Sequence, residues 1–558
     1  MVKKIVKLLN KEISGLHEAA YLLGAFAFMS HLLALLRDRS LAHFFGAGQT
    51  LDIYYASFRI PDFLFITVAS IVSISVLIPF ISDREQENKK EEQKFINSIF
   101  TSFFAFMTAT SVVVFFLIPI ILKYVFPGFD EQALNETIKL TRILLLSPFL
   151  LGLSNLFASI IQVNKKFLVY AISPLLYNLG IIVGIFFFYP VFGLKGLVFG
   201  VVFGAFLHLF IQVPVAMEIG LFPKFTTKIN FKDVKKVVLL SLPRTLTMSA
   251  NQISLFALIG FASTMGVGAI SIFNFSYNIQ SVPLSIIGVS YSVAAFPTLA
   301  KLFSRGETEK FLAQIISAAR HIIFWSIPAL ILFIVLRAQI VRTILGTGEF
   351  DWSATRLTAA CLALFALSVA AQSLVLLFVR GYYAMGNTKR PLFVNIFSSV
   401  MIIVFSVILS WAFVNIDIFK YFMEDILRVS DVGNTKVLML ALGYSLGTTL
   451  NAILLILLFQ KDFKQFVLSI SRTFWHSLSA SIVMGFVAYQ SLVFFGYLLD
   501  INTVAGIFLQ GLFAGLIGIV AGIVVLALLK NNELKEIRKS LNMKIWKSGV
   551  IIPEKREL

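Results

Sequence analysis

Long apolar runs recur along the whole chain and are separated by polar or charged segments. Most runs are about twenty residues long, the length that an α-helix needs to cross ~30 Å of hydrocarbon. The pattern predicts about fourteen transmembrane helices, over residues 17–36, 54–81, 96–122, 139–162, 167–189, 193–217, 237–263, 267–300, 313–336, 357–380, 391–414, 437–459, 469–497 and 503–529. Runs such as IIVGIFFFYPVFGLKGLVFGVVFGAF lack the alternation of β-barrel strands. The predicted fold class is therefore an all-α polytopic membrane protein.

Short motifs recur in the same order in the two halves of the chain. The segment PLLYN at 174–178 returns as PLFVN at 391–395. Three further pairs keep this order: Leu140-Thr141 with Leu357-Thr358, Gly46–Gly48 with Gly266–Gly268, and Gly200 and Gly204 with Gly443 and Gly447. Because each half holds six spans, both halves enter the membrane from the same side. The pattern therefore predicts two parallel six-helix repeats, related by an axis along the membrane normal.

The repeats set the predicted domain boundaries. These are an N-terminal six-helix half at 1–218, a cytoplasmic amphipathic linker at 219–236, a C-terminal six-helix half at 237–460, two extra transmembrane helices at 461–530 and a basic cytoplasmic tail at 531–558. Twelve repeated spans plus two are typical of transporters, in which a binding site is expected between the repeats near the midplane.

Composition and charge support a membrane protein. The chain is 58% hydrophobic and has a net charge of +18, and its mean hydropathy of +0.89 is too high for a soluble domain. Lys and Arg concentrate in segments such as REQENKKEEQK and KFTTKINFKDVKK, so the positive-inside rule predicts cytoplasmic N- and C-termini. The charge is thus a topology signal, and we expect no nucleic-acid partner.

The sequence contains no constellation typical of a soluble enzyme. It has no phosphate-binding Gly-rich loop, no metal-ligand cluster among the six His and no convincing nucleophile–base pair. The one cysteine, Cys361, lies in an apolar run, so no internal disulfide can form. We therefore predict no enzymatic activity, no catalytic residue, no metal and no cofactor. Coupling to a monovalent cation or to the membrane potential is left open, without a site.

The first predicted helix carries polar residues on one face. At 100° per residue, Ser30 and Arg37 share a face, with His31 and Asp38 at its edge. A charge at membrane depth usually faces the protein interior or a cavity, which makes these residues binding candidates. The alternative for Arg37 is snorkelling to the interface with Asp38 as a local partner. Arg39 is expected to mark the exit of the helix into the extracytoplasmic turn.

Other polar residues at the spans have alternatives of their own. Arg59 and Asp62 flank Pro61 at the start of the second predicted span, where they would form a loop-end ion pair if they bind no ligand. Intramembrane asparagines such as Asn178 and Asn278 are typical of interhelical hydrogen bonding.

The segment SHLLALLRDRSLAHFFGAGQTLDIYYASFRIPDFL, residues 30–64, resembles the opening signature of the MurJ/MviN family of lipid II flippases. That signature has the form S-R-x-L-G-x-x-R-D, followed by F-G-A-G and by an Asp leading into F-K-L-P-N. The matching residues are Ser30, Arg37, Asp38, Phe45, Gly46, Ala47, Gly48, Asp52, Phe58 and Pro61. The segments NQISL at 251–255, FPTLAKLF at 296–303 and RGYYAMGNTKRP at 380–391 also look like family segments.

The resemblance implies alternating access in the multidrug/oligosaccharidyl-lipid/polysaccharide exporter superfamily. A central cationic cavity would take the diphosphate-sugar head of an undecaprenyl-linked peptidoglycan precursor, while the lipid tail stays in a groove made with the last two spans. Arginine suits such a cavity because it binds phosphate oxygens bidentately. The implied partners are the lipid-linked precursor, membrane lipids and the cell-wall synthesis machinery. The implied protein is a monomer in the bacterial cytoplasmic (inner) membrane.

The chain departs from the family pattern at several cavity positions. His31 stands where the family has an arginine, Asn278 aligns with the functional arginine of span 8, and Arg59 replaces a lysine. The substrate-binding candidates are Ser30, His31, Arg37, Asp38, Asp52, Arg59 and Asn278. The missing arginines keep two alternatives open, namely an exporter of another lipid-linked oligosaccharide or drug-like cation, and a non-transporting scaffold for envelope assembly.

Overall fold

The structure, a computed structural model, describes residues 16–69, 77–78, 80–82, 84, 88–464 and 466–546, and all of its regular elements in these ranges are helices. By length and composition, 11 helices could cross a membrane, or up to 12 if α18 (Trp352–Ala366) and α19 (Val369–Ala384), which are bent by 42°, form one span. The predicted all-helical polytopic fold is confirmed. The predicted spans 17–36 and 54–81 are not among these helices, and the second includes residues outside the described ranges.

The chain forms two compact units. Unit 1 comprises Met1–Ile279, Ile344–Cys361 and Thr388–Gly447, and unit 2 comprises Gln280–Thr343, Leu362–Asn387 and Thr448–Leu558. The predicted N-terminal half, 1–218, lies in unit 1, whereas the predicted C-terminal half, 237–460, is divided between the two units, and the relation of the halves as repeats stays a prediction.

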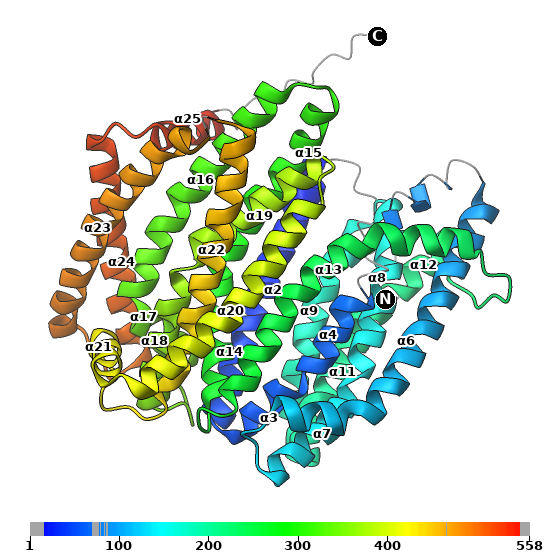
Figure 1. The fold of residues 1–558 in the computed structure, drawn as a ribbon, viewed down its shortest axis with the longest axis horizontal. Helices are drawn as coiled ribbons and strands as arrows, with labels where there is room; N and C mark the ends of the chain where they lie inside the picture. Colours follow the sequence, from blue (N-terminus) through cyan, green and yellow to red (C-terminus); the bar gives the residue numbers. More distant parts are fainter. Residues whose placement is uncertain are drawn as a thin grey trace. The chain divides into compact units, whose positions relative to one another are not determined.

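Unit 1 contains the first half of the chain and two later groups of residues (Figure 1). Its elements are α2 (Leu16–Phe45), α3 (Gln49–Ser57), α4 (Arg59–Thr67), α6 (Lys89–Val125), α7 (Glu131–Leu144), α8 (Leu146–Val163), α9 (Phe167–Val183), the π-helical turn η2 (Gly184–Phe188), α10 (Tyr189–Phe192), α11 (Leu194–Phe210), α12 (Val213–Ile219), α13 (Phe231–Ala262), the first part of α14 (Ala269–Pro283), the start of α18, α20 (Lys389–Asn415), α21 (Asp417–Leu427), η4 (Thr435–Val437) and the start of α22 (Leu438–Asp462).

Unit 2 contains the remaining helices. They are the end of α14, η3 (Leu284–Val289), α15 (Ser290–Ser304), α16 (Thr308–Val335), most of α17 (Arg337–Leu345), the end of α18, α19, the rest of α22, α23 (Phe466–Leu498), α24 (Val504–Leu528) and α25 (Asn532–Trp546). The predicted extra spans 469–497 and 503–529 correspond to α23 and α24, which lie side by side (Figure 1). Gly518 of α24 allows this approach, because a Cβ there would lie 2.8 Å from the Ala488 Cβ of α23.

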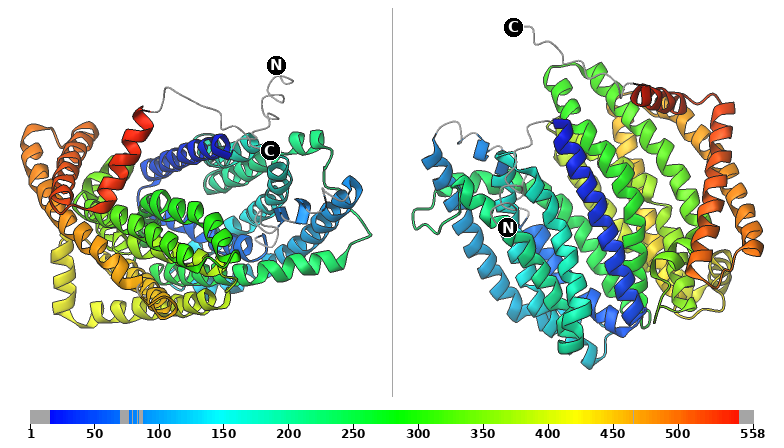
Figure 2. Two further views of the ribbon diagram at one scale, coloured as in Figure 1. Left: turned by 90° about the horizontal axis from the view of Figure 1, so that it is seen from above. Right: turned by 180° about the vertical axis from the view of Figure 1, so that it is seen from behind.

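Glycine lets two helices of unit 1 approach to backbone contact. Gly180 of α9 faces Gly204 of α11, and Gly184, at the start of η2, faces Gly200. A Cβ on any of these four glycines would overlap the backbone opposite. Small-residue contacts of this kind replace the hydrophobic driving force that helices lack in lipid. As a result α9 is fixed between α11 and α2 (Figure 2).

The glycines of the second predicted repeat make the same kind of contact. Gly443 and Gly447 of α22 lie against Ser406 and Ile402 of α20, where an added Cβ would overlap the partner helix. The PLFVN segment lies on α20, as the PLLYN segment lies on α9. Each motif-bearing helix is therefore held by glycines on the helix that follows it in the repeat.

The GAG and GVG turns lie next to each other at one end of unit 1. Gly46 and Gly268 have φ angles of +59° and +86°, which strain any residue with a side chain. A Cβ on Gly268 would overlap the carbonyl of Ala47. Close beside them, the Glu349 N–H donates to the His43 carbonyl at 3.0 Å. These turns fix the ends of α2, α3 and α14 relative to one another, and those helices carry the candidate site.

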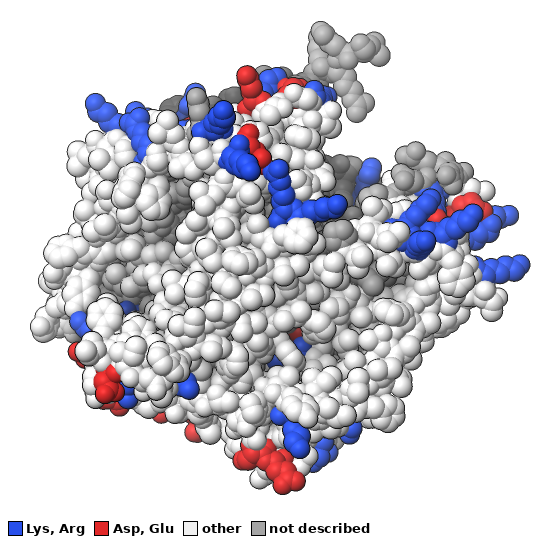
Figure 3. Space-filling view, in the orientation of Figure 1, with Lys and Arg blue, Asp and Glu red and all other residues white. Residues whose placement is uncertain are grey.

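Charged side chains of unit 1 gather where helices begin. Lys89 and Lys90 open α6, and α13 begins at Phe231 with exposed lysines at 232, 235 and 236. Figure 3 shows Lys and Arg collected at these helix starts and uncharged surface along α6. Such a distribution is typical of helices that cross a membrane.

Candidate functional site

The charged triplet Arg37-Asp38-Arg39 lies inside α2 and not at its end. The helix continues to Phe45, about two turns beyond the predicted exit. Arg39 donates to the carbonyl oxygen of Ile344 at 3.3 Å. The expectation that Arg39 marks the helix exit is therefore wrong, because the apolar residues after it, from Leu41 on, extend the helix.

Arg37 and Asp38 form an ion pair that faces the inside of unit 1. The Nε and Nη2 groups of Arg37 donate to Asp38 Oδ1 at 2.9 and 2.8 Å, and Nη1 donates to Asn178 Oδ1 of α9 at 3.1 Å. The Arg37 side chain is 21% exposed and that of Asp38 is 4% exposed. A pair this close gains on the order of 4 kcal/mol at an effective dielectric constant of ~20, which offsets part of the cost of burying both charges.

Asn178 joins two turns of α2. Its Nδ2 group donates to Ser30 Oγ at 3.3 Å and to the Pro174 carbonyl at 3.2 Å, while its Oδ1 accepts from Arg37. Ser30 and Arg37 are seven residues apart and so share a helix face. His31 is half-buried and makes no hydrogen bond or ion pair with any described residue. The structure therefore places Ser30 in the cluster and leaves His31 at its edge.

Two asparagines on α14 connect this pair to Arg59. Asn278 Nδ2 donates to Asp38 Oδ2 at 3.1 Å, and Arg59 Nη2, at the start of α4, donates to Asn274 Oδ1 at 2.7 Å. Asn274 and Asn278 are four residues apart, so they lie on one face of α14 with an axial rise of ~6 Å. Arg59 and the carboxylate of the Arg37–Asp38 pair thus contact successive turns of one face of α14. We call Ser30, Arg37, Asp38, Arg59, Asn178, Asn274 and Asn278 the α14 polar cluster.

The two arginines differ in their charge balance. Arg37 is neutralised by Asp38, whereas Arg59 forms no ion pair with any described residue. Arg59 donates from Nε to the Tyr55 carbonyl at 3.2 Å and from Nη2 to Asn274. Its Nη1 group donates to no described residue. The loop-end pair with Asp62 is not formed as a contact within 4 Å, although the two charges are near enough to interact electrostatically. Arg59 is therefore the group in the cluster with spare donors and positive charge for an anion.

Asp52 lies apart from the cluster and caps α14. It is 3% exposed, and it accepts hydrogen bonds from Gly268 N at 2.6 Å, Ser271 N at 2.8 Å and Ser271 Oγ at 2.7 Å. These N–H groups stand at the N-terminus of α14, where a carboxylate is stabilised by unpaired N–H donors and by the helix dipole. Since its oxygens are occupied, Asp52 is placed to orient α14 and the asparagines that α14 carries.

Asn178 and Asn274 complete the cluster, and the sequence assigned neither to the site. Asn178 was predicted as an interhelical hydrogen-bond residue, and it does bridge α9 and α2, but its partner is the candidate Arg37. Asn274 could have been identified from its position four residues before Asn278, which places both side chains on one helix face. Among the described residues, no group of three or more His, Cys, Asp or Glu could hold a metal ion.

Comparison with known proteins places these features in a family. The profile of the family "Lipid II flippase MurJ" matches residues 41–509. A probable lipid II flippase MurJ of Thermotoga maritima is 28% identical over 396 residues, which are 70% of this chain and 79% of that protein. The corresponding protein of Borreliella burgdorferi is 26% identical over 385 residues, 68% of this chain and 75% of its own length.

Solved structures show the same fold. A lipid II flippase MurJ in an inward closed conformation aligns with a TM-score of 0.72 at 21% identity, over 92% of this chain and 100% of that chain. An inward-facing multidrug resistance MATE family transporter of the MOP superfamily aligns with a TM-score of 0.62 at 17% identity, over 80% of this chain and 98% of that chain. The family resemblance inferred from residues 30–64 is confirmed by the profile match, and the family is one of transporters and not of enzymes. The chain belongs to the MurJ family of lipid II flippases.

Proposed function

We propose that this multi-pass membrane protein moves a polyprenyl-diphosphate-linked peptidoglycan precursor of the lipid II type across the bacterial cytoplasmic membrane by alternating access. The observation that carries the proposal is the α14 polar cluster inside unit 1, in which Arg59 and the Arg37–Asp38 pair are connected to successive turns of one face of α14. Family membership supports the substrate class. Both termini would lie in the cytoplasm, as the distribution of basic loops requires.

The chemistry of the cluster suits a diphosphate. Arg59 has spare donors and no carboxylate in direct contact, since Asp62 interacts with it only at longer range, so it would make the first contact with phosphate oxygens. Arg37 would then exchange Asp38 Oδ1 for a second phosphate oxygen while Asn178 holds its Nη1 group. Asp38 would remain attached to Asn278, which limits how far the displaced carboxylate moves.

Asp38 also favours release of the substrate from Arg37. A guanidinium without a counter-charge would bind a diphosphate tightly and release it slowly in a low-dielectric cavity. Because Asp38 is next to Arg37 in α2, Arg37 can form its ion pair with Asp38 again when the head group leaves. The pair therefore tunes binding so that release is not prevented by the cost of an unpaired buried charge.

The remaining parts of the assignment rest on the family and on unit 2. The polyprenyl tail would lie along α23 and α24, whose outward side chains are apolar and exposed, among them Phe486, Val520 and Val524. The partners would be the lipid-linked precursor, membrane lipids and the cell-wall synthesis machinery. The protein would act as a monomer.

The test is a flipping assay in proteoliposomes with labelled lipid II, together with rescue of cells depleted of their own flippase. Arg59→Ala should lower the transport rate about tenfold or more, because it removes charge-assisted hydrogen bonds worth ~1.5–3 kcal/mol. Arg142→Ala is the matched control, since this arginine also lies in unit 1 but stacks on Phe115 of α6 at 4.5 Å from the ring centroid. It should leave the rate unchanged.

Three results would overturn the proposal. Transport of lipid II that is unaffected by both Arg59→Ala and Arg37→Ala would refute the role of the cluster. Transport of a neutral lipid-linked oligosaccharide or of a drug-like cation in place of lipid II would assign a different exporter on the same fold. A well-folded protein that neither rescues depleted cells nor changes conformation with any of these substrates would indicate the envelope-assembly scaffold.

A further inference from the structure

A pocket separate from the α14 polar cluster lies between α13 and α20 in unit 1. It has a volume of about 340 Å³ and is lined by the end of α13 and the turn after it, by the last turns of α20, and by η4. The lining residues are Phe261, Thr264, Met265, Ser406, Val407, Ser410, Trp411, Val414, Asn415 and Lys436. This volume is at the lower end of the ~300–1,000 Å³ typical of small-molecule sites.

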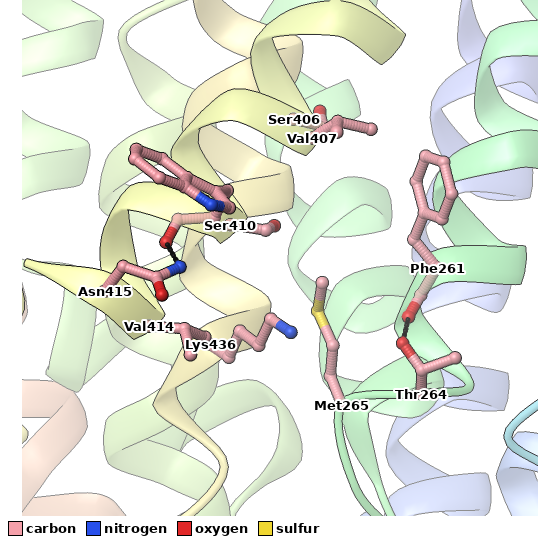
Figure 4. Close-up of a pocket in the computed structure, with 10 residues that line it drawn as sticks. Phe261, Thr264, Met265, Ser406, Val407, Ser410, Val414, Asn415 and Lys436 are labelled. Atoms are coloured by element: carbon pink, nitrogen blue, oxygen red, sulfur yellow. Dashed lines mark hydrogen bonds between the residues drawn. The ribbon is translucent and has the colours of Figure 1, made fainter.

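One cation points into this mainly apolar pocket. Figure 4 shows the Lys436 ammonium group in the space between α20 and Met265. Lys436 is half-buried and forms no ion pair or hydrogen bond with any described residue. Its three donors therefore lack acceptors from the protein. An anion of matching size would supply them.

The other polar groups of the pocket differ in whether they are already hydrogen-bonded within the protein. Ser410 Oγ is buried and has no hydrogen-bond partner among the described residues, so it can donate to an oxygen atom. Thr264 and Asn415 are satisfied locally, by the Phe261 carbonyl at 2.8 Å and the Trp411 carbonyl at 2.8 Å (Figure 4). The unsatisfied groups are thus one ammonium and one hydroxyl, a set that suits a phosphodiester better than a cation or a neutral sugar.

The helix that follows α20 indicates that this pocket lies at a membrane surface. On α21, Ile418, Tyr421, Phe422 and Ile426 are 83%, 62%, 59% and 60% exposed, whereas Met423 and Leu427 are buried. An amphipathic helix that keeps an apolar face outward is typical of one lying in the lipid interface. Since α21 starts two residues after α20 ends, the last turn of α20 is at interface depth.

We propose that the α13–α20–η4 pocket binds the phosphodiester head group of an anionic membrane phospholipid from the leaflet in which α21 lies. Lys436 would bind the phosphate, with Ser410 donating to a second oxygen. The pocket is too small for a whole lipid, and the exposed side chains of Val400, Val404, Val407 and Ile408 continue it along α20 as an apolar track for an acyl chain. Trp411, 61% exposed at the level of the pocket, is placed as an interfacial aromatic residue.

The position of Trp411 supplies the probe. The chain has 5 Trp residues, so a variant with Trp325, Trp352, Trp475 and Trp546 replaced by Phe reports on Trp411 alone. The full-length variant would be reconstituted in nanodiscs in which acyl-brominated phosphatidylglycerol or acyl-brominated phosphatidylcholine is titrated into unbrominated lipid. The expected result is preferential quenching by brominated phosphatidylglycerol, roughly fivefold in apparent relative affinity, which is the effect of one interfacial lysine.

Charge variants test the assignment. Lys436→Gln should reduce the preference to about one, and Lys436→Arg should keep it, which separates charge from folding. Lys123→Gln is the matched control, since Lys123 is exposed in the last turn of α6, which packs beside Gly260 at the same end of α13. It should leave the preference unchanged. Inorganic phosphate should not compete if the occupant is a lipid. Equal quenching by both lipids, a preference that survives Lys436→Gln, or displacement by free phosphate would overturn the proposal.

Discussion

Asp52 matches the family signature, and substitutions at this position can show whether its carboxylate stabilises the fold or binds the substrate. Its three hydrogen bonds all go to residues at the N-terminus of α14, 216 and 219 positions away in the chain. Asp52→Ala leaves the buried Gly268 and Ser271 N–H groups without an acceptor. Each unpaired buried N–H costs ~1–3 kcal/mol, and the lost charge at the helix N-terminus adds ~0.3–1 kcal/mol. The expected loss of unfolding free energy is about 4 kcal/mol.

Asp52→Asn should cost about half as much. Its remaining carbonyl oxygen can still accept from Ser271, but the amide NH₂ then faces the Gly268 N–H, so that one donor stays unpaired. The assay is reversible unfolding in mixed micelles followed by circular dichroism, with lipid II flipping measured on the same preparations. Gln49→Ala is the control from the same helix, since Gln49 makes an exposed 3.3 Å contact with Asp130. It should change the unfolding free energy by less than ~0.5 kcal/mol.

The pair of readouts decides between the two roles. If Asp52 caps α14, stability and transport should fall together in Asp52→Ala, and cells rescued by the variant should improve at lower temperature. If Asp52 binds the substrate, Asp52→Asn should lose transport while its unfolding free energy stays within ~0.5 kcal/mol of the original protein. The second outcome would refute the capping role.

Two further perturbations follow from packing and from charge. Gly204→Ala places a Cβ against the Tyr177 carbonyl of α9 and should destabilise unit 1 by ~1–3 kcal/mol in the same unfolding assay. Gly24→Ala is the control, because a Cβ there meets nothing within 4 Å, and it should be neutral or slightly stabilising. Equal effects of the two substitutions would contradict the close α9–α11 contact. The hydrogen bond from Arg356 holds the pKa of Asp431, in the loop before η4, below its usual value. A lowered folded-state pKa means that the contact stabilises the loop above the unfolded pKa of ~3.9 and is lost as pH falls through the folded value. The protection factors for amide hydrogen exchange in the 428–434 loop, which correct for the intrinsic pH dependence of exchange, should therefore fall below about pH 4. Asp431→Asn should show the lower protection already at neutral pH, and a pH-independent protection factor would contradict the anchoring.

Hydrophobic periodicity predicted the class of fold and most spans, because the length of an apolar run is set by membrane thickness. It failed at the charged triplet, since α2 runs on through Arg37-Asp38-Arg39 to Phe45. A local pattern cannot show that Asn178 and Ile344, both remote in sequence, satisfy two of those charges. Similarly, the signature match identified Asp52 but not its role, which depends on the turn at Gly268.

The cluster itself was predicted in part. The helical face of α2 brought Ser30 and Arg37 together, as found. The sequence could not show that Arg59 is bound by Asn274 and makes no direct contact with Asp62, because Asn274 lies on a helix 215 residues away. Whether the candidate residues contact a substrate stays a prediction.

Asn274 and Asn278 connect Arg59 and the Arg37–Asp38 pair to the same helix, α14. Because both asparagines project from one face of α14, a turn of that helix about its axis would strain the Arg59 contact and the Asp38 contact together. Any change that draws Asp38 away from Asn278 would therefore also be expected to affect the Arg59 contact with Asn274. The resemblance implies that only Arg37 keeps a cavity arginine of the family and that Arg59 stands in place of a lysine, so a joint response of these two residues through α14 is the expectation to test.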